Sequence, residues 1–305
     1  MKTALDLPAV LALVVMCGSW GLNQVAIKVA LYGIPPVLQM GGRSLIAALC
    51  VLLWCGLRRK PLLLADGTLW PGLAAGVLFA AEFAVLFWGM QFTTASRAVI
   101  ILYLAPFVVA IGGHFVLGEP LGWRKLAGLA FAFSGVVLAF SDARPTAATA
   151  TGDTLFGDLM CLAAAILWGV TTVLIKGSAL ARAPAEKTLL YQLGVSAVLG
   201  LALSVALGEQ VAAGRALAVL PAFLYQAVWV AAFTYVAWFA MMRRYPASLL
   251  SAFTFLTPLF DVAFGAALLG DPLSPKLLAA LLLVALGIYL VNRSPGGARV
   301  AAAAV

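Results

Sequence analysis

The chain has 305 residues, of which 64% are hydrophobic and 10% are charged, and its mean hydropathy is +1.09. A soluble globule of this length has too little interior to bury that much apolar surface, which excludes a water-soluble domain. The net charge of +8 does not indicate a nucleic-acid-binding protein, because the 19 basic residues are dispersed among apolar runs and form no long basic stripe. The composition therefore predicts a protein whose partner is the lipid bilayer and not a nucleic acid.

Ten apolar runs are long enough to cross the hydrocarbon core of a bilayer, which takes roughly 17 to 25 helical residues. The first run continues far beyond the length of a secretory signal, so we expect the N-terminus to be retained. We predict an all-α polytopic membrane protein with ten transmembrane helices. The expected spans cover residues 8–31, 36–57, 69–91, 95–117, 122–141, 156–180, 186–207, 219–242, 248–269 and 274–292.

One stretch of the chain occurs twice. Residues 95–138 recur without a gap as residues 247–290, so that equivalent positions are 152 residues apart. Each copy opens with Ala-Ser, has a proline eleven residues after that alanine (Pro106 and Pro258), and then reaches Gly-acid-Pro-Leu. Apolar low complexity can match Leu and Ala by chance, but not these markers in one register. The stretch is an internal repeat.

Each copy predicts two membrane helices joined by a tight turn. Glycine allows an unusual backbone conformation, and the proline after the acid cannot continue the preceding helix. Gly118-Glu119-Pro120 and Gly270-Asp271-Pro272 therefore end one span and lead into the next. We interpret both acids as members of solvated turns.

The first helix of each half is repeated as well, because Trp20–Lys28 matches Trp168–Lys176 at an offset of 148. The chain thus contains two halves of five spans. A unit with an odd number of spans starts and ends on opposite sides of the bilayer, so its copy must enter upside down. The predicted units are a first repeat at residues 1–141, a linker at 142–153, a second, inverted repeat at 154–293 and a tail at 294–305.

The basic residues of the loops predict the orientation. If the N-terminus is in the cytoplasm, the inside segments carry twelve Lys and Arg residues and the outside segments carry four. Such an excess is typical of cytoplasmic loops. We therefore expect both termini, including the tail, to be cytoplasmic.

Three charged residues lie well inside predicted spans: Arg43, Glu82 and Asp261. Each costs about 2.5 to 3.5 kcal/mol at the centre of a membrane helix on insertion scales. In the predicted orientation they share one depth with Asn23 and form a charge layer. Two interpretations stay open, a structural ion pair that locks helices together or an electrostatic element of a substrate or proton site.

Several predicted spans carry aromatic and small polar residues on one face at helical spacing. Any one aromatic residue of a membrane helix is more often a packing residue or an interfacial anchor. As a set that recurs in both halves near mid-span, however, these residues predict the wall of a central substrate-binding cavity. They are Trp20, Asn23, Glu82, Phe83, Tyr103, Trp168, Thr171, Thr234, Tyr235 and Trp238.

Pro106 and Pro258 lie close to the middle of the fourth and ninth spans, where each removes a backbone hydrogen bond and permits a kink. We expect these kinks to be moving parts. The single histidine, His114, is interpreted as a satisfied interface residue rather than a proton relay. The four cysteines lie in apolar runs and no Cys or His cluster has metal-ligand spacing, so we expect no disulfide, metal or cofactor.

The Trp-Gly pair in the first span of each half, the Ala-Ser openings, the mid-span prolines and the Gly-acid-Pro turns together resemble the EamA-type branch of the drug/metabolite transporter superfamily. Within that branch the chain is most similar to bacterial exporters of aromatic and other amino acids, of the YddG kind. The resemblance implies an inner-membrane carrier with a central cavity lined by spans 1, 3, 4, 6, 8 and 9, and with spans 5 and 10 at the periphery. It does not fix the substrate, since members handle amino acids, nucleotide sugars, cationic drugs and other metabolites.

Secondary transport is the leading interpretation, and the sequence has no Walker-type phosphate loop. An intramembrane enzyme is a distant alternative, because no nucleophile is paired with a base at a recognisable spacing, and we expect no catalysis. Aromatic faces with charges of both signs favour a zwitterion that has an apolar side chain. We therefore predict a monomer in the bacterial inner membrane that exports neutral amino acids, aromatic or large aliphatic, by alternating access. Export of cationic drugs or other small metabolites is the alternative, since Glu82 beside aromatic rings would also suit a cation.

Overall fold

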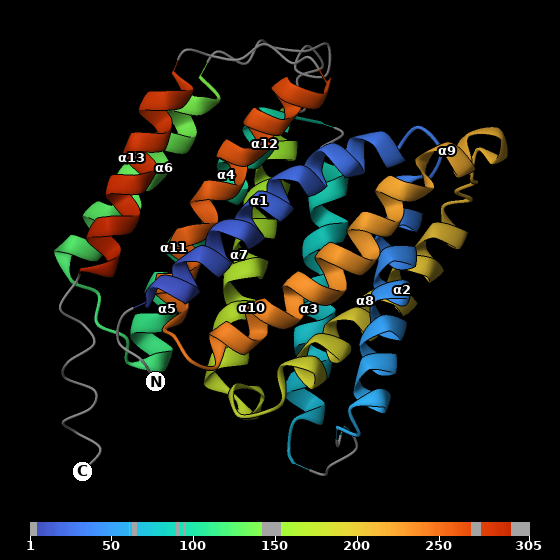
Figure 1. Cartoon of the computed structure of the whole chain (residues 1–305), viewed down its shortest axis with the longest axis horizontal. Coiled ribbons are helices and arrows are strands. Elements are labelled where there is room, and N and C mark those ends of the chain that lie inside the picture. The colour runs from blue at the N-terminus through green and yellow to red at the C-terminus, as the bar shows by residue number, and fades with distance from the viewer. Residues whose placement is uncertain are drawn as a thin grey trace.

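The computed structural model describes residues 5–60, 62, 66–89, 92–93, 95–141, 154–269 and 276–293. In this part of the chain every regular element is a helix (Figure 1). Eight helical runs are long and apolar enough to cross a membrane. The protein is therefore an all-helical, multi-pass membrane protein. The predicted linker, the Gly270-Asp271-Pro272 turn and the C-terminal tail lie outside the described residues.

The helices follow the predicted spans closely where a span is one helix, and the second begins and ends at the predicted residues. The first is started by Asp6, whose carboxylate accepts a hydrogen bond from the Ala9 N–H (3.1 Å). In chain order the α-helices are α1 (Leu7–Ala30), α2 (Pro36–Leu57), α3 (Leu69–Gly89), α4 (Ala95–Leu102), α5 (Ala105–Leu117), α6 (Trp123–Ala139), α7 (Thr154–Gly177), α8 (Ala185–Ala206), α9 (Ala213–Leu224), α10 (Tyr235–Met242), α11 (Ala247–Phe253), α12 (Thr257–Phe264) and α13 (Leu277–Asn292).

Three predicted spans are not regular along their length. The fourth consists of α4 and α5, separated at residues 103–104, and the ninth consists of α11 and α12, separated by the 3-10 turn Thr254–Leu256. Pro106 and Pro258 lie in the first turn of α5 and of α12, where the missing N–H is tolerated. The eighth span runs from α9 through the π-helical segment Tyr225–Thr234 into α10.

The fifth and tenth predicted spans are shorter helices that pair at one edge of the bundle (Figure 1). α6 has 17 residues and α13 has 16, fewer than the eight longer runs. Small residues let the two helices approach closely. A Cβ atom on Gly128 would lie 2.7 Å from the carbonyl oxygen of Gly287, and one on Gly135 would lie 2.7 Å from that of Ala280.

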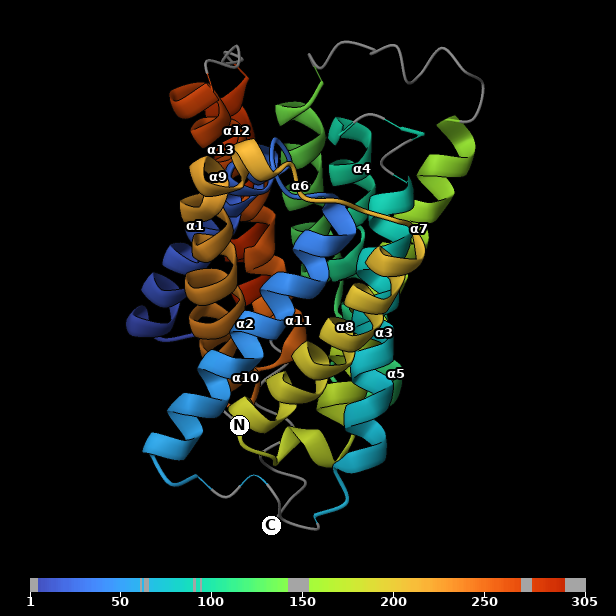
Figure 2. The ribbon, with the colours of Figure 1, turned by 90° about the vertical axis from the view of Figure 1, so that its right-hand side faces the viewer.

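Contacts between the two halves recur between residues that are 152 positions apart. Ser44 and Ser196 have that separation, and their Oγ atoms are 3.2 Å apart where α2 lies against α8 (Figure 2). Tyr103 and Phe255 have it too, with ring centroids 6.1 Å apart. The two glycine contacts of α6 with α13 are equivalent to each other as well, because Gly128 and Ala280 are 152 positions apart and so are Gly135 and Gly287. These are the contacts expected along a two-fold axis that relates the halves.

The outward surface of the bundle is apolar. The side chains of Phe115, Val205 and Leu217 are 79%, 80% and 84% exposed. In water such exposure of large hydrophobic groups would be unfavourable, whereas in a bilayer these side chains meet lipid tails. The many apolar residues of the chain therefore form two kinds of surface, one buried between helices and one that faces the lipid.

Candidate functional site

Aromatic side chains from α1, α3 and α10 meet in the middle of the bundle. The Trp20 indole N–H donates a hydrogen bond to Thr234 Oγ1 (2.8 Å), which fixes the ring beside α10. The Trp20 ring centroid is 5.3 Å from that of Trp238 and 6.2 Å from that of Tyr235, both in edge-to-face geometry. Phe79 extends the group to α3, 6.4 Å from Tyr235. We name these five residues the central cluster.

A second aromatic group adjoins the central cluster at the helix breaks. The Tyr103 ring lies 6.0 Å from Trp168 of α7 and 6.1 Å from Phe255 of the 3-10 turn. Tyr103 is also close enough to Tyr235 to interact with it electrostatically. The aromatic residues predicted from the two halves thus come together, and the interrupted fourth and ninth spans are what bring Tyr103 and Phe255 to the centre.

The predicted neutral polar residues differ in their partners. Thr171 donates its hydroxyl to the Leu167 carbonyl one turn earlier (2.7 Å), so its proton is used within α7. Thr234 likewise donates to Val230 (2.7 Å) and accepts from Trp20. Asn23 is 7% exposed, and its Oδ1 has no hydrogen-bond partner in the described part of the chain. Of these three residues, Asn23 is therefore the one whose side-chain oxygen could accept a hydrogen bond from a ligand.

Arg43 is 3% exposed, and its guanidinium carbon lies 4.5 Å from the centroid of the Phe83 ring. Glu82, at 8% exposure, is near enough to interact electrostatically with Arg43, and both act on Tyr235. Among the described residues no carboxylate lies within 4.0 Å of the Arg43 guanidinium, so the structure shows a cation-π contact rather than a direct ion pair there. That Glu82 or Asp261 compensates Arg43 stays a prediction.

Asp261 lies in a different part of the charge layer. It follows Phe260 on α12, and the backbone at these two residues packs directly on Gly21 of α1. A Cβ at Gly21 would lie 2.8 Å from the Asp261 nitrogen, so only glycine permits this approach. Asp261 acts electrostatically on Tyr103. Charges of both signs therefore border the aromatic groups.

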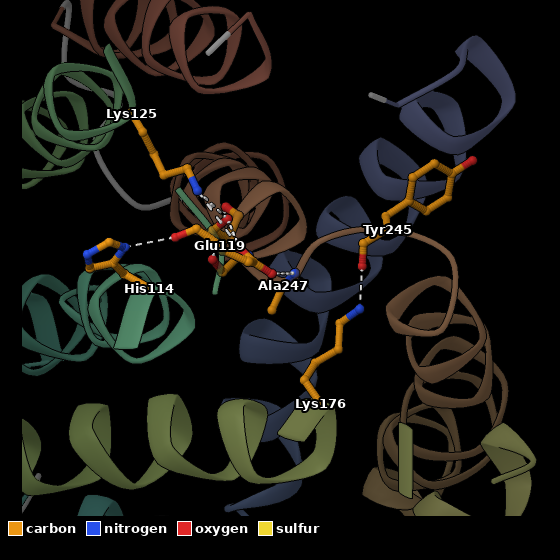
Figure 3. Close-up of polar contacts among 8 residues, drawn as sticks. His114, Glu119, Lys125, Lys176, Tyr245 and Ala247 are labelled. Carbon is orange, nitrogen blue, oxygen red and sulfur yellow. Dashed lines mark hydrogen bonds and ion pairs between the residues drawn. The ribbon is translucent and has the colours of Figure 1, made fainter. Parts of the chain in front are cut away.

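At one end of the bundle Glu119 joins the two halves (Figure 3). Its Oε1 accepts a hydrogen bond from the Ala247 N–H (2.9 Å), and its Oε2 accepts from the N–H (3.4 Å) and the hydroxyl of Ser248. Lys125 donates to Ser248 Oγ (2.9 Å) and lies 3.8 Å from Glu119 Oε2. Glu119, Lys125, Ala247 and Ser248 are named the Glu119 joint.

The interpretation of Glu119 as part of a solvated turn is wrong. The residue is only 9% exposed, because its carboxylate caps the first N–H groups of α11, which otherwise have no partner in the helix. Gly118 makes this possible with a left-handed backbone (φ 68°) that turns the chain after α5. The only sequence feature that pointed to a role for Glu119 was that the acid turn and the Ala-Ser opening recur together in both halves. The repeat alone did not predict that the acid of one half contacts the Ala-Ser opening of the other.

Other side chains fasten the short connection between α10 and α11. The Lys176 ammonium donates to the Tyr245 carbonyl (2.6 Å), as Figure 3 shows, and the Tyr245 hydroxyl donates to Asp6 (3.0 Å), which caps the start of α1. His114 Nδ1 is hydrogen-bonded to the backbone carbonyl oxygen of Glu119 (3.1 Å). His114 thus has a hydrogen-bond partner within its own segment, while its side chain is exposed, and its role as an interface residue stays a prediction.

The opposite end of the bundle has a smaller joint. Asp158 of α7 accepts a hydrogen bond from the Thr93 hydroxyl (2.7 Å) and forms an ion pair with Arg97 of α4. Thr93 and Tyr245 are equivalent positions of the repeat, and each donates its hydroxyl to an aspartate near the start of the first helix of the other half. No group of three or more His, Cys, Asp or Glu residues in the described ranges is placed to hold a metal ion.

Long apolar helices around a buried layer of aromatic, polar and charged side chains define a polytopic membrane transporter. The model of the EamA-like transporter family matches residues 7–141 and again residues 155–293, and the chain belongs to this family.

Of three curated relatives, two match 89% of this chain and the third matches 55%. A protein of Bacillus subtilis described as "Uncharacterized transporter YoaV" is 27% identical over 89% of this chain and 92% of its own length. A "Probable amino-acid metabolite efflux pump" of Salmonella typhimurium is 30% identical over 89% of this chain and 90% of its own length. A protein of the same description from Escherichia coli is 33% identical over 55% of this chain and 52% of its own length.

A solved crystal structure has the same fold. It superposes with a TM-score of 0.74, at 18% sequence identity, over 92% of this chain and 93% of its own. At that sequence identity the similarity supports the arrangement of the helices and gives no information on the substrate.

Proposed function

We propose that this transporter exports neutral amino acids, aromatic or large aliphatic, through the space between its two halves. The observation that carries the proposal is the central cluster with opposite charges at its border. The rings of Trp20, Tyr235 and Trp238 offer an apolar surface, while Arg43 and Glu82 are buried beside them. A zwitterion with an apolar side chain matches all three features at once.

Other substrate classes fit this centre less well. A nucleotide sugar brings two or more negative charges and would need several unpaired cations, whereas Arg43 already lies against Phe83. A permanently cationic compound would be attracted by Glu82 and the rings, which makes it the second candidate. The names of the Salmonella and Escherichia coli relatives, which mention amino-acid metabolites, support the first.

The proposal includes the full predicted architecture of ten spans in two inverted halves, residues 1–141 and 154–293. Two observations support it: the antiparallel pairing of α6 with α13, and the meeting of Ser44 with its equivalent Ser196. We place the Glu119 end in the cytoplasm on the distribution of basic residues in the loops. The protein is then a monomeric carrier of a bacterial inner membrane with both termini inside.

Topology is tested by the sidedness of single cysteines. A cysteine that replaces Arg215, in the first turn of α9, should react with an impermeant maleimide from outside the cell, and one that replaces Arg59 should not. Labelling of both positions from one side would contradict the inverted halves.

Transport in this proposal proceeds by alternating access, in which one half rocks against the other. Pro106 and Pro258 lie where the fourth and ninth spans are interrupted, so these breaks are natural points of bending. Replacing either proline by alanine is expected to slow turnover more than it weakens substrate binding. Equal losses of turnover and affinity would assign the prolines to the shape of the site instead.

Proteoliposomes test the substrate. Purified protein should take up labelled Phe, Met or Thr above empty vesicles, and Glu82→Gln should impair this uptake. Glu209→Gln is the matched control, because Glu209 caps the start of α2 through the N–H groups of Val37 and Leu38, away from the central cluster. Robust flux of a quaternary ammonium compound without amino-acid flux would replace this proposal by cation export.

A further inference from the structure

The equivalent helices α4 and α11, which lie at opposite ends of the bundle, differ in how deeply they are buried. All seven residues of α11 are buried, and the span that contains it is 67% buried, the highest fraction among the eight long runs. Its equivalent, α4, belongs to a span that is 33% buried, the lowest fraction. A helix with no lipid-facing side chain lies between the halves rather than at their periphery.

The neighbours of the two helices differ in the same way. Both helices touch both halves, but α11 packs against five helices, α1, α5, α7, α10 and α13, whereas the main partners of α4 are α6 and α7 alone. In particular, where the structure describes both pairs, the contact of α11 with α5 is more extensive than the equivalent contact of α4 with α12. Over the described residues, α11 at the Glu119 end is therefore packed more closely between helices than α4 at the Asp158 end.

α11 also lies between the Glu119 joint and the centre. It starts at Ala247, which is bound by Glu119, and its last residue, Phe253, accepts a hydrogen bond from the Cys17 thiol of α1 (3.3 Å). The next turn of the chain carries Phe255, whose ring faces Tyr103. A solute moving from this end to the aromatic groups would have to pass α11.

We propose that the Glu119 joint is the inner gate of the transporter, which holds α11 across the cytoplasmic end of the pathway and must open to admit substrate. This rests on the alternating-access transport proposed above. The gate closes through the hydrogen bonds of Glu119 to the start of α11, with Lys125 bridging Glu119 and Ser248. The 3-10 turn Thr254–Leu256 is the point about which α11 can swing.

The joint is suited to reversible closure because its bonds are few and polar. On opening, water can replace each of them at Glu119, Lys125 and Ser248, whereas separated apolar surfaces would have no such substitute. Loss of the carboxylate cap should shift the closed-to-open ratio by about 5- to 30-fold, the factor that corresponds to a helix cap of ordinary strength. Transport rates and substrate affinity need not be known to detect such a shift.

Cys17 is a native reporter for the gate, since it is fully buried against α11. In a chain whose other cysteines are replaced by alanine, an impermeant maleimide is applied to inside-out vesicles and, separately, to intact cells. Glu119→Gln is expected to raise the labelling rate from the cytoplasmic side by about 5- to 30-fold and to leave outside labelling unchanged or lower. Glu209→Gln, which weakens a similar cap at the opposite end, should not raise cytoplasmic labelling.

The outcomes separate a gate from a structural contact. If Glu119→Gln lowers the yield of folded protein, Ser248→Ala removes the hydroxyl partner of both Glu119 and Lys125 and keeps the Ala247 bond. Equal rises from both sides would show general loosening and overturn the proposal, as would no rise in either variant or a rise from outside only. Because labelling needs no substrate, a rise from the cytoplasmic side supports the gate even where amino-acid flux fails.

Discussion

The contact of α6 with α13 gives a prediction whose magnitude follows from distances. A methyl group added at Gly287 would lie 2.5 Å from the backbone nitrogen of Ala132 and 2.7 Å from its Cβ atom. The obstructing atoms belong to the α6 backbone and to a Cβ fixed on it, and they cannot rotate away. Gly287→Ala therefore forces α13 away from α6.

Overpacking of this kind costs about 1 to 3 kcal/mol, and the better helix propensity of alanine offsets about 1 kcal/mol of it. Gly194→Ala is the matched control, because it lies inside α8 and no atom is within 4 Å of its added Cβ. That variant should keep the gain in propensity. The free energies of unfolding of the two variants should then differ by about 1 to 3 kcal/mol.

The assay is denaturant unfolding of both variants in the same detergent, followed by uptake in proteoliposomes. Since α6 and α13 lie at the edge of the bundle (Figure 1), Gly287→Ala should leave the substrate concentration for half-maximal uptake unchanged. Equal stability of Gly287→Ala and Gly194→Ala would refute the close approach of the helices. A selective loss of substrate affinity in Gly287→Ala would refute the peripheral role of the pair.

Three further predictions concern particular side chains, two taken singly and one as a pair. Thr234→Val should destabilise the protein by about 1 to 3 kcal/mol and reduce uptake, because the Trp20 N–H loses its acceptor; Thr234→Ser should restore both, and equal effects of Val and Ser would contradict the role of this bond. Replacing Arg43 by Met or Glu82 by Gln alone should cost several kcal/mol by leaving the other buried charge uncompensated, and the double variant should be milder than the worse single one; additive losses in a double-mutant cycle would disprove the coupling. In the connection between α2 and α3, hydrogen bonds from Thr68 and then Lys187 lower the pKa of Asp66 from its ordinary value of 3.8 to about 2. Its contribution to stability is therefore present above pH 3.8 and is lost as the pH falls through about 2. The difference in melting temperature between the natural protein and Asp66→Asn should shrink over this fall in pH, and a difference that stays the same below about pH 2 would contradict the assignment.

Much of the fold could be predicted from local sequence, because the features that decide it are local. Whether a helix crosses a membrane depends on the hydropathy of about twenty consecutive residues, and α1, α2 and α8 lie within a residue or so of their predicted limits. Pro106 and Pro258 were expected to permit kinks, because a proline removes a backbone donor whatever surrounds it, and each lies in the first turn of the helix that follows an interruption of its span. The repeat, with its offset of 152 residues, predicted which positions of the two halves are equivalent.

The partners of buried polar groups were decided by the tertiary structure. Nothing near Arg43 in the sequence says that its guanidinium lies over Phe83 rather than against a carboxylate, because the two are brought together by the packing of α2 on α3 and α8. Glu119 was expected in water and is buried, because the start of α11, 128 residues away, supplies N–H groups that only a side chain can satisfy there. Hydropathy and helix breaks are properties of a segment, and the sequence by itself determined those. A hydrogen bond or a ring contact is a property of two segments, and only the fold that brings them together decides it.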